Sequence, residues 1–274
     1  MPVLRPVLAV VRRDLRTAAR YPLGMTNFVL LSPFYQLILP SLLLGSAFLV
    51  QGRSVGLAAM AGTSDLPGFL FTGALVQSLL LGTCWGVNLT LSMDRELGTL
   101  EHNFLAPLRR DTFVLGSALA SLVISTLAGV LLLVLGEVLF GARYLSAVVL
   151  AMPALLLTMV ALVGLAHLIA AAVLLLRQAD MIVDGVTFAL AVLSGVLFPV
   201  TVLPVWVRPL ALALPTTYAL DVLRHQALGT APLLPVPLAY AAASGGAVAL
   251  VVVGRWTFRR AERRLEAAGT LVQH

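Results

Sequence analysis

The sequence predicts an all-α membrane protein with six transmembrane helices, and two observations carry this prediction. Hydrophobic residues make up 60% of the 274-residue chain and charged residues only 11%, whereas an ordinary soluble domain has roughly 25% charged residues. The apolar residues also form long runs that short polar segments separate. A helix of about 20 apolar residues is long enough to cross a bilayer.

All 18 basic residues are arginine, because the sequence contains no lysine. A P-loop needs a lysine to reach the phosphates of ATP, so we expect no conventional ATPase within this chain, and a Schiff-base enzyme is excluded for the same reason. The single cysteine, Cys84, allows neither an intramolecular disulfide nor a cysteine metal cluster. We therefore expect no catalytic residues, no metal site and no cofactor in this chain.

Residues 1–22 predict an amphipathic helix on the inner surface of the membrane. Apolar residues alternate here with arginines, which suits a helix whose basic side faces anionic headgroups. The segment lacks the unbroken apolar region of a secretory signal. A domain of six spans is expected at residues 23–256, followed by a basic cytoplasmic tail at residues 257–274.

Three spans are expected in the first half of the chain, at residues 27–50, 68–92 and 112–140. Pro33 and Pro40 predict a kink in the first span, where Gln36 is more typical of a hydrogen bond between helices than of a substrate contact. Gly82 and Gly86 in the second span have the spacing that allows two helices to pack closely.

Three further spans are expected at residues 145–176, 181–200 and 238–256. The first of these exceeds a bilayer thickness, so we expect tilting, kinking at Pro153 or an interfacial end. His167 has no ionisable partner in its span and is interpreted as a neutral, hydrogen-bonded imidazole rather than a proton relay. Asp180 and Asp184 are interpreted as favouring the positive end of a helix dipole rather than as a metal pair, because no third ligand is nearby.

The polar segment 93–111 between two spans is too charged to lie in hydrocarbon. Its charged residues are Asp94, Arg95, Glu96, Glu101, Arg109, Arg110 and Asp111. The pattern predicts an amphipathic helix over residues 96–105, with Leu97, Leu100, Phe104 and Leu105 on one face. Pro107 then ends this helix. A short amphipathic helix between two spans could hold a soluble partner.

Residues 194–224 are apolar but interrupted by Pro199, Pro204, Pro209 and Pro215. Four prolines make an unbroken spanning helix implausible. We expect short helices that dip into the outer leaflet and return, with Trp206 and Tyr218 at the membrane interface.

The arginines predict the orientation of the chain. With six spans and both ends inside, most arginines lie on the cytoplasmic side, and the four outside are Arg53, Arg143, Arg208 and Arg224. This bias favours a cytoplasmic polar segment 93–111. Because the arginines gather at the ends of apolar runs, we expect no nucleic-acid partner.

Two motifs in this order resemble a known family. They are RELGTLE at residues 95–101, followed by Pro107, and SGVLFPVTVLPVWVRPLALALPTTYALDVLR at residues 194–224. Together they resemble the permease subunit of bacterial type-2 ABC transporters, a family that exports drugs, lipo-oligosaccharides and polysaccharides. The resemblance covers nearly the whole chain.

The resemblance implies that residues 95–107 form a coupling helix that docks into a separate cytoplasmic ABC ATPase, present in two copies, which binds ATP and Mg. The coupling residues would be Arg95, Glu96, Leu97, Gly98, Thr99, Leu100, Glu101, Phe104 and Pro107. A second permease chain, most simply an identical copy, would complete the complex in the bacterial inner (plasma) membrane, with both termini cytoplasmic.

The resemblance also implies a translocation pathway between the two permeases, for which the candidate residues are Gln36, Asn88, Phe188, Ser194 and Phe198. The outer end would be capped by a re-entrant segment at residues 198–224, including Pro199, Pro204, Trp206, Pro215, Tyr218, Asp221 and Arg224. The cargo stays open: a hydrophobic or amphipathic drug, a lipid or a lipid-linked glycan. The alternatives are an intramembrane lipid-modifying enzyme and an ion-coupled carrier.

Overall fold

The computed structural model describes residues 4–20, 31, 34–35, 49–50, 53–96, 110–140, 144–176 and 179–268. Within these ranges the regular structure is helical, apart from one short antiparallel pair formed by β1 (Leu49–Val50) and β2 (Arg53–Ser54). The predicted all-α class is therefore confirmed for the described part of the chain.

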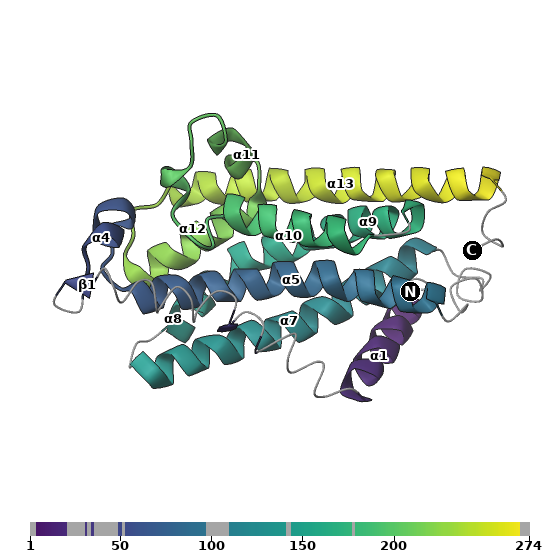
Figure 1. Cartoon of the computed structure of the whole chain (residues 1–274), viewed down its shortest axis with the longest axis horizontal. Coiled ribbons are helices and arrows are strands. Elements are labelled where there is room, and N and C mark those ends of the chain that lie inside the picture. Colours follow the sequence, from purple (N-terminus) through teal and green to yellow (C-terminus); the bar gives the residue numbers. More distant parts are fainter. Residues whose placement is uncertain are drawn as a thin grey trace.

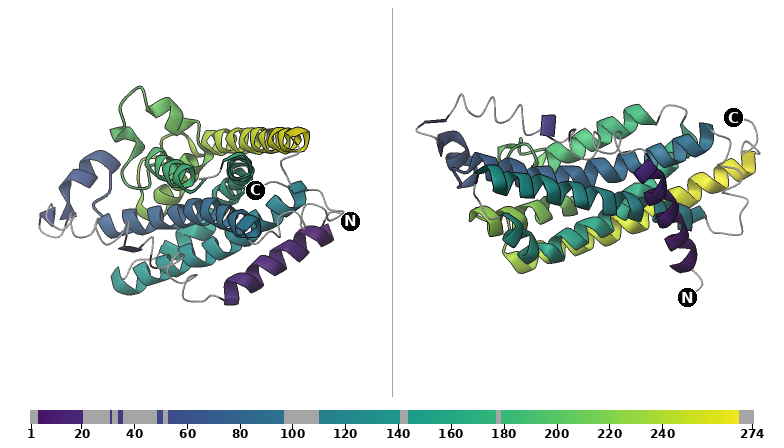
Figure 2. Two further views of the ribbon diagram at one scale, coloured as in Figure 1. Left: turned by 45° about the vertical axis from the view of Figure 1, so that its right-hand side comes forward. Right: turned by 90° about the horizontal axis from the view of Figure 1, so that it is seen from below.

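Four long helices lie side by side along the molecule (Figure 1). They are α5 (Leu66–Glu96), α7 (Arg110–Phe140), α9 (Met152–Leu175) and α13 (Val236–Ala268). The shorter helices are α1 (Leu4–Arg20), α4 (Val55–Ala61), α8 (Tyr144–Leu150), α10 (Asp180–Leu193), η3 (Val200–Val202), α11 (Arg208–Leu212) and α12 (Pro215–Leu228). Helix α1 crosses the end of the bundle at which α5 and α13 finish, and α4 and α11 lie towards the opposite end (Figure 2).

Four helices in the described ranges are long and apolar enough to cross a membrane: Leu66–Glu96, Arg110–Leu139, Met152–Leu175 and Val236–Leu265. They correspond to the predicted second, third, fourth and sixth spans. The predicted first span at residues 27–50 lies almost entirely outside the described residues. The structure therefore supports a multi-pass membrane protein, while the count of six stays a prediction.

The predicted fifth span, residues 181–200, is shorter than expected. Helix α10 has 14 residues and ends at Leu193, so it extends about 21 Å, against a hydrocarbon core of about 30 Å. Gly195 follows in the left-handed conformation with φ +81, and the Val196 and Gly195 amides donate to the Ala191 and Val192 carbonyls. This is a Schellman turn, which glycine favours and which ends a helix.

The predicted long segment 145–176 forms two helices instead of one. Helix α8 ends at Leu150, and α9 begins at Met152 with a proline in its first turn. That proline is Pro153, which is tolerated at a helix start because its missing amide would have no intrahelical partner there. The structure thus places the break two residues before the proline.

The predicted close packing at Gly82 and Gly86 is confirmed. A Cβ atom on either glycine of α5 would overlap the side chain of Ser125 or Ser121 on α7. The backbones of α5 and α7 consequently approach closely along this face, as small residues allow in membrane helices.

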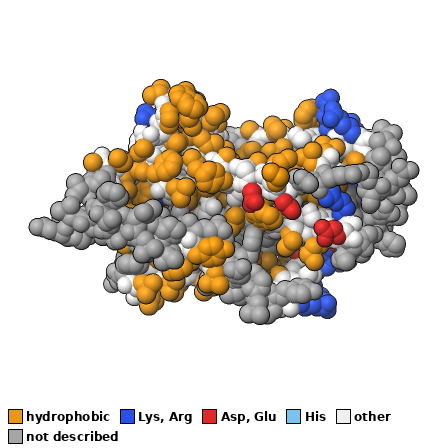
Figure 3. Space-filling view, viewed as in Figure 1, with side chains coloured by type: hydrophobic (Ala, Val, Ile, Leu, Met, Phe, Trp, Pro, Cys, Tyr) orange, Lys and Arg blue, Asp and Glu red, His pale blue; other side chains and the backbone are white. Residues whose placement is uncertain are grey.

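Hydrophobic side chains cover much of the described surface, whereas the basic side chains gather mainly at the end of the bundle that carries α1 and the end of α13 (Figure 3). Helix α13 continues past the predicted end of the sixth span at residue 256 and carries the arginines of the predicted tail up to Ala268. An apolar belt with a basic end is the distribution expected for a protein whose basic end faces the cytoplasm.

Candidate functional site

The predicted coupling segment begins at the end of α5. Arg95 and Glu96 are the last residues of that helix, and α7 begins at Arg110. The other predicted coupling residues, Leu97, Gly98, Thr99, Leu100, Glu101, Phe104 and Pro107, lie outside the described residues. The site is therefore described through the two helix ends that flank this segment, the end of α5 and the start of α7.

Arg95 joins the end of α5 to the end of α9. Its Nη1 atom lies 3.1 Å from the carbonyl oxygens of both Val173 and Leu176. The last carbonyls of a helix lack intrahelical partners and carry partial negative charge, so a guanidinium is well suited to bind them. The side chain fixes the α5 end just before the predicted coupling residues.

Helix α1 packs against the helices at this end of α5. Val7 and Val10 are buried against α7, where a side chain on Gly116 would collide with Val10. Asp14 accepts a hydrogen bond of 2.7 Å from Ser117 of α7. Arg13 lies 3.4 Å from Asp94 at the end of α5, so α1 contacts both helices that flank the coupling segment.

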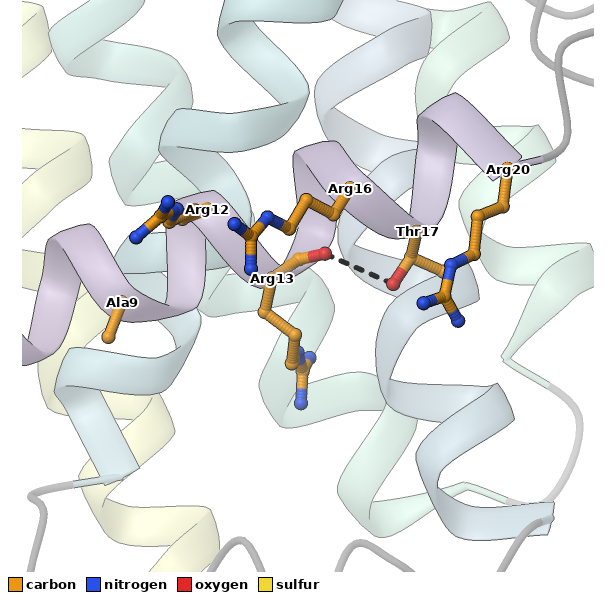
Figure 4. Close-up of a pocket in the computed structure, with 6 residues that line it drawn as sticks. All are labelled: Ala9, Arg12, Arg13, Arg16, Thr17 and Arg20. Atoms are coloured by element: carbon orange, nitrogen blue, oxygen red, sulfur yellow. Dashed lines mark hydrogen bonds between the residues drawn. The ribbon is translucent and has the colours of Figure 1, made fainter.

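One side of α1 carries a basic groove. Its lining consists of Ala9, Arg12, Arg13, Arg16, Thr17 and Arg20, which Figure 4 shows along one side of the helix. The hollow has a volume of about 390 Å³. Its guanidinium groups suit the phosphates of anionic lipids at a membrane surface, which agrees with the orientation expected from the sequence.

His167 has an ionisable partner, contrary to the sequence prediction. Its Nε2 lies 2.9 Å from Asp111 Oδ1, and its Nδ1 lies 2.7 Å from the Val163 carbonyl oxygen. Asp111 also contacts Arg255 and, at 3.7 Å, Arg259. The prediction failed because Asp111 is 56 residues away in the sequence, and the resulting cluster joins α7, α9 and α13.

Asp180 lies in the first turn of α10, as expected for a carboxylate near the positive end of a helix dipole, but neither aspartate caps the helix and both contact α5. The residue before α10 is Ala179, and no side chain caps the helix there. Asp180 Oδ1 instead accepts a hydrogen bond of 2.6 Å from Asn88, and Asp184 Oδ1 accepts one of 3.1 Å from the Trp85 indole. The signal in the sequence for this contact was Asn88, a polar residue near the inner end of the second predicted span.

The predicted pathway residues do not share one environment. Asn88 is buried beside α10, whereas Phe188 is 66% exposed on α10. Ser194 is buried and hydrogen-bonded to Thr216 at 2.5 Å, and Phe198 packs against the small cluster of Val200, Leu203 and Ala211. Gln36 lies outside the described residues.

The predicted re-entrant segment forms η3, α11 and α12, with Pro199 before η3, Pro204 before α11 and Pro215 at the start of α12. Trp206 is 79% exposed, as an interfacial residue would be. The Tyr218 hydroxyl donates to the Leu212 carbonyl at 2.6 Å. These short helices agree with the broken pattern of the sequence, although their depth in a membrane stays a prediction.

Arg224 and Asp221 anchor this segment from α12. Arg224 is buried and donates to the carbonyls of Gly195, Val196 and Phe69 at 2.7–3.1 Å, with its guanidinium 3.4 Å from the centre of the Phe69 ring. Asp221 accepts the Leu233 amide at 2.9 Å. Burial raises the pKa of Asp221 to about 6. Arg224 was expected on the outer side of the membrane, and the structure adds that its side chain is buried.

Comparison with known proteins gives one result for the chain as a whole. A family model described as ABC-2 type transporter matches residues 6–228, which is most of the sequence and includes both motifs. No curated protein is similar enough to the chain to count as a match.

Proposed function

Because the chain belongs to the ABC-2 type transporter family, we propose that it is the permease subunit of an exporter driven by ATP hydrolysis in a separate cytoplasmic subunit. The observation that carries the proposal is the family match together with the anchored helix ends around residues 97–109. Force that a cytoplasmic partner applies to that segment can move the spans only if the helices on both sides of the segment are firmly packed against the rest of the bundle.

The contacts of the two helix ends support this role. Arg95 ties the end of α5 to the C-terminal carbonyls of α9, and Arg110, at the start of α7, lies 3.3 Å from Glu262 of α13. A displacement of residues 97–109 would therefore reach four long helices through direct contacts. The α1 helix, held by Asp94 and Ser117, would move with them.

The complete transporter would contain two copies of an ABC ATPase and a second permease, most simply an identical chain. The ATPase would supply the bound ATP and Mg. A hydrophobic or amphipathic cargo would leave the cytoplasm or the inner leaflet between the two permeases. The chain would lie in the bacterial inner membrane with both ends in the cytoplasm, and the α1 groove would contact anionic lipids.

Co-purification with an ABC ATPase from the same organism tests the proposal. The native chain should retain that ATPase in the membrane fraction, and Glu101→Arg or Leu100→Asp should release it while the permease is still inserted. Glu137→Gln is the matched control, because Glu137 lies on α7 and accepts the Leu145 amide far from the coupling segment. Retention of the ATPase by both coupling variants would contradict the assignment of the docking segment.

The pair of His167 and Asp111 favours one second candidate, an ion-coupled carrier. Paired ionisable groups within spans are typical of proton pathways. Against it, Asp111 is in the first turn of α7 and also contacts two arginines of α13, an arrangement that suits a static link between helices. Uptake or efflux driven by a pH gradient in vesicles that contain this chain alone would favour the carrier over the ATP-driven exporter.

A further inference from the structure

The contact between α5 and α10 carries an unusual concentration of hydrogen-bond acceptors. We define the α5–α10 seam as Trp85 and Asn88 of α5 with Asp180 and Asp184 of α10. The two α5 residues lie about 60° apart around the helix axis at ~100° per residue. The hydrogen bonds from Asn88 to Asp180 and from Trp85 to Asp184 show that this face of α5 meets α10.

The two carboxylates lie some way along the bundle from its charged end. Asn88 and Trp85 precede Asp94 by six and nine residues, so their partners lie about 9 Å and 13 Å from it along α5 at ~1.5 Å per residue. Like charges four residues apart destabilise a helix, and a carboxylate within or beside a predicted span costs further free energy. The helix dipole offsets this at Asp180 in the first turn, but not at Asp184 in the second.

Among the described residues, no cationic side chain forms a salt bridge with these carboxylates. Arg95, the guanidinium at this end of α5, donates to the carbonyls that end α9. The negative charge of the seam is therefore not neutralised by a described side chain.

A buried amide oxygen without a partner gives a second, independent indication. Asn88 is 1% exposed, and its amide reaches Asp180 through Nδ2, which places its Oδ1 beside the same carboxylate. No described residue donates a hydrogen bond to Asn88 Oδ1. An unsatisfied buried acceptor is costly, so this oxygen favours a ligand that brings an N–H donor.

The α10 side of the seam is open and apolar around its charges. Asp180 and Asp184 are exposed, and Met181 and Phe188 on the same helix are 76% and 66% exposed. Figure 3 shows acidic side chains set among hydrophobic ones in the middle of the described face. A ligand could thus place a charged group at the carboxylates and an apolar group on α10.

We propose that the α5–α10 seam binds the protonated amine of an amphipathic cargo, with the carboxylates of Asp180 and Asp184 as counter-ions. The inference rests on the proposed function, because it names the class of cargo that the exporter carries. An ammonium group offers several N–H donors and one positive charge, which matches two carboxylates and the amide oxygen of Asn88. The same charges would repel phosphate or carboxylate headgroups, so an anionic lipid is not the expected ligand.

Three dansyl probes of similar size test the proposal on the full-length protein in phosphatidylcholine vesicles. Dansylcadaverine carries an ammonium group, N-butyl dansylamide is neutral, and dansylglycine carries a carboxylate. The chain has three tryptophans, so Trp206→Phe with Trp256→Phe leaves Trp85 in the seam as the only energy donor. We expect saturable energy transfer from Trp85 to dansylcadaverine, with an affinity about tenfold above that for the neutral probe, because charge-assisted hydrogen bonds are stronger than neutral ones.

Charge removal at the seam supplies the decisive comparison. Asp180→Asn with Asp184→Asn keeps an acceptor for Asn88 and Trp85 but removes the charges, and should abolish the preference for dansylcadaverine. Glu137→Gln, the same change on α7, should preserve it. If the double variant does not fold, competition on the native chain replaces it: dodecylammonium should displace dansylcadaverine and dodecanoate should not.

Equal binding of the charged and neutral probes, or an unchanged preference in the double variant, would overturn the inference. If that happened while the ATPase still co-purified with the chain, the proposed function would stand without this cargo class. If the seam bound ammonium but no ATPase associated with the chain, the site would stand and the ATP-driven mechanism would fall.

Discussion

Arg224 is the residue on which the packing of the outer segment depends most. Its guanidinium satisfies the carbonyls at the end of α10 and one carbonyl of α5, and it stacks on Phe69. Three segments that are far apart in the sequence therefore share one buried cation. Arginine suits this position because its fixed, planar set of donors can serve several acceptors at once.

We predict that Arg224→Met lowers the free energy of unfolding by roughly 2–4 kcal/mol, because the apolar replacement leaves buried carbonyls without donors. The thermal unfolding of the purified protein, followed by size-exclusion chromatography after heating, measures the effect. Arg208→Met is the matched control: Arg208 also donates to carbonyls, those of Leu203 and Thr201, but it is exposed. Equal losses for the two variants would contradict the anchoring role of Arg224.

Asp221 gives a prediction that depends on pH. Burial is the main cause of its raised pKa of about 6, against about 4 in the unfolded chain. Ionisation therefore favours the unfolded state, and the stabilising contribution of the protonated carboxyl is lost as the pH rises from about 4 to 6. Asp221→Asn keeps an acceptor for the Leu233 amide and avoids this loss.

The expected gain from Asp221→Asn is about 1–3 kcal/mol at pH 7.5 and close to zero at pH 4. Unfolding midpoints of both proteins at the two pH values provide the measurement. Asp221→Ala serves as the control, since it removes the charge but also the acceptor of the Leu233 amide, and should gain less. A gain of the same size at both pH values would show that ionisation of Asp221 is not its cause.

At the scale of elements, the contact between α5 and α7 depends on glycine facing serine. A methyl group at Gly82 would overlap the Ser125 side chain, so we predict that Gly82→Ala destabilises the protein by about 1–3 kcal/mol through overpacking. Ser125→Gly in the same chain should restore much of the loss. Thermal unfolding of the single and double variants measures both effects.

Gly245 of α13 supplies the control for this substitution. Nothing lies within 4 Å of a Cβ atom built on Gly245, so Gly245→Ala should stabilise its helix by up to about 1 kcal/mol through helix propensity alone. If Gly82→Ala were equally well tolerated, the helices would not be held together at this contact.

Periodicity and composition predicted the helices themselves, because apolar length and proline or glycine positions are local properties. The end of α10 was not predicted, although Gly195 directly after Ser194 is a local signal for a helix end. This glycine forms the Schellman turn. The partners of His167, Asp180 and Arg224 could not be predicted, since each lies on another helix. Such contacts depend on which helix faces pack together, and the packing of helix faces cannot be predicted from the local pattern of a single sequence.

At the scale of the whole molecule, the two ends of the bundle are held together by different contacts. Arg13 with Asp94, Arg95 with the α9 carbonyls, and Asp111 with His167 and Arg255 link five helices at the basic end. The opposite end is held by the re-entrant helices around Arg224. A rigid inner end suits the transmission of force from a cytoplasmic partner, and this interpretation requires that the basic end face the cytoplasm.

Site-directed labelling tests that orientation for the full chain. In a Cys84→Ser background, which has no cysteine, Thr17→Cys places a thiol on the exposed side of α1 and Ser64→Cys places one in the exposed loop before α5. The arginine bias predicts that a membrane-impermeant maleimide labels residue 64 in intact cells, and residue 17 only after permeabilisation. Ala74→Cys, buried in α5, should stay unlabelled throughout and so controls for unfolded protein. Labelling of residue 17 from outside intact cells would place the coupling segment on the wrong side of the membrane for a cytoplasmic ATPase, and the proposed function would fail with it.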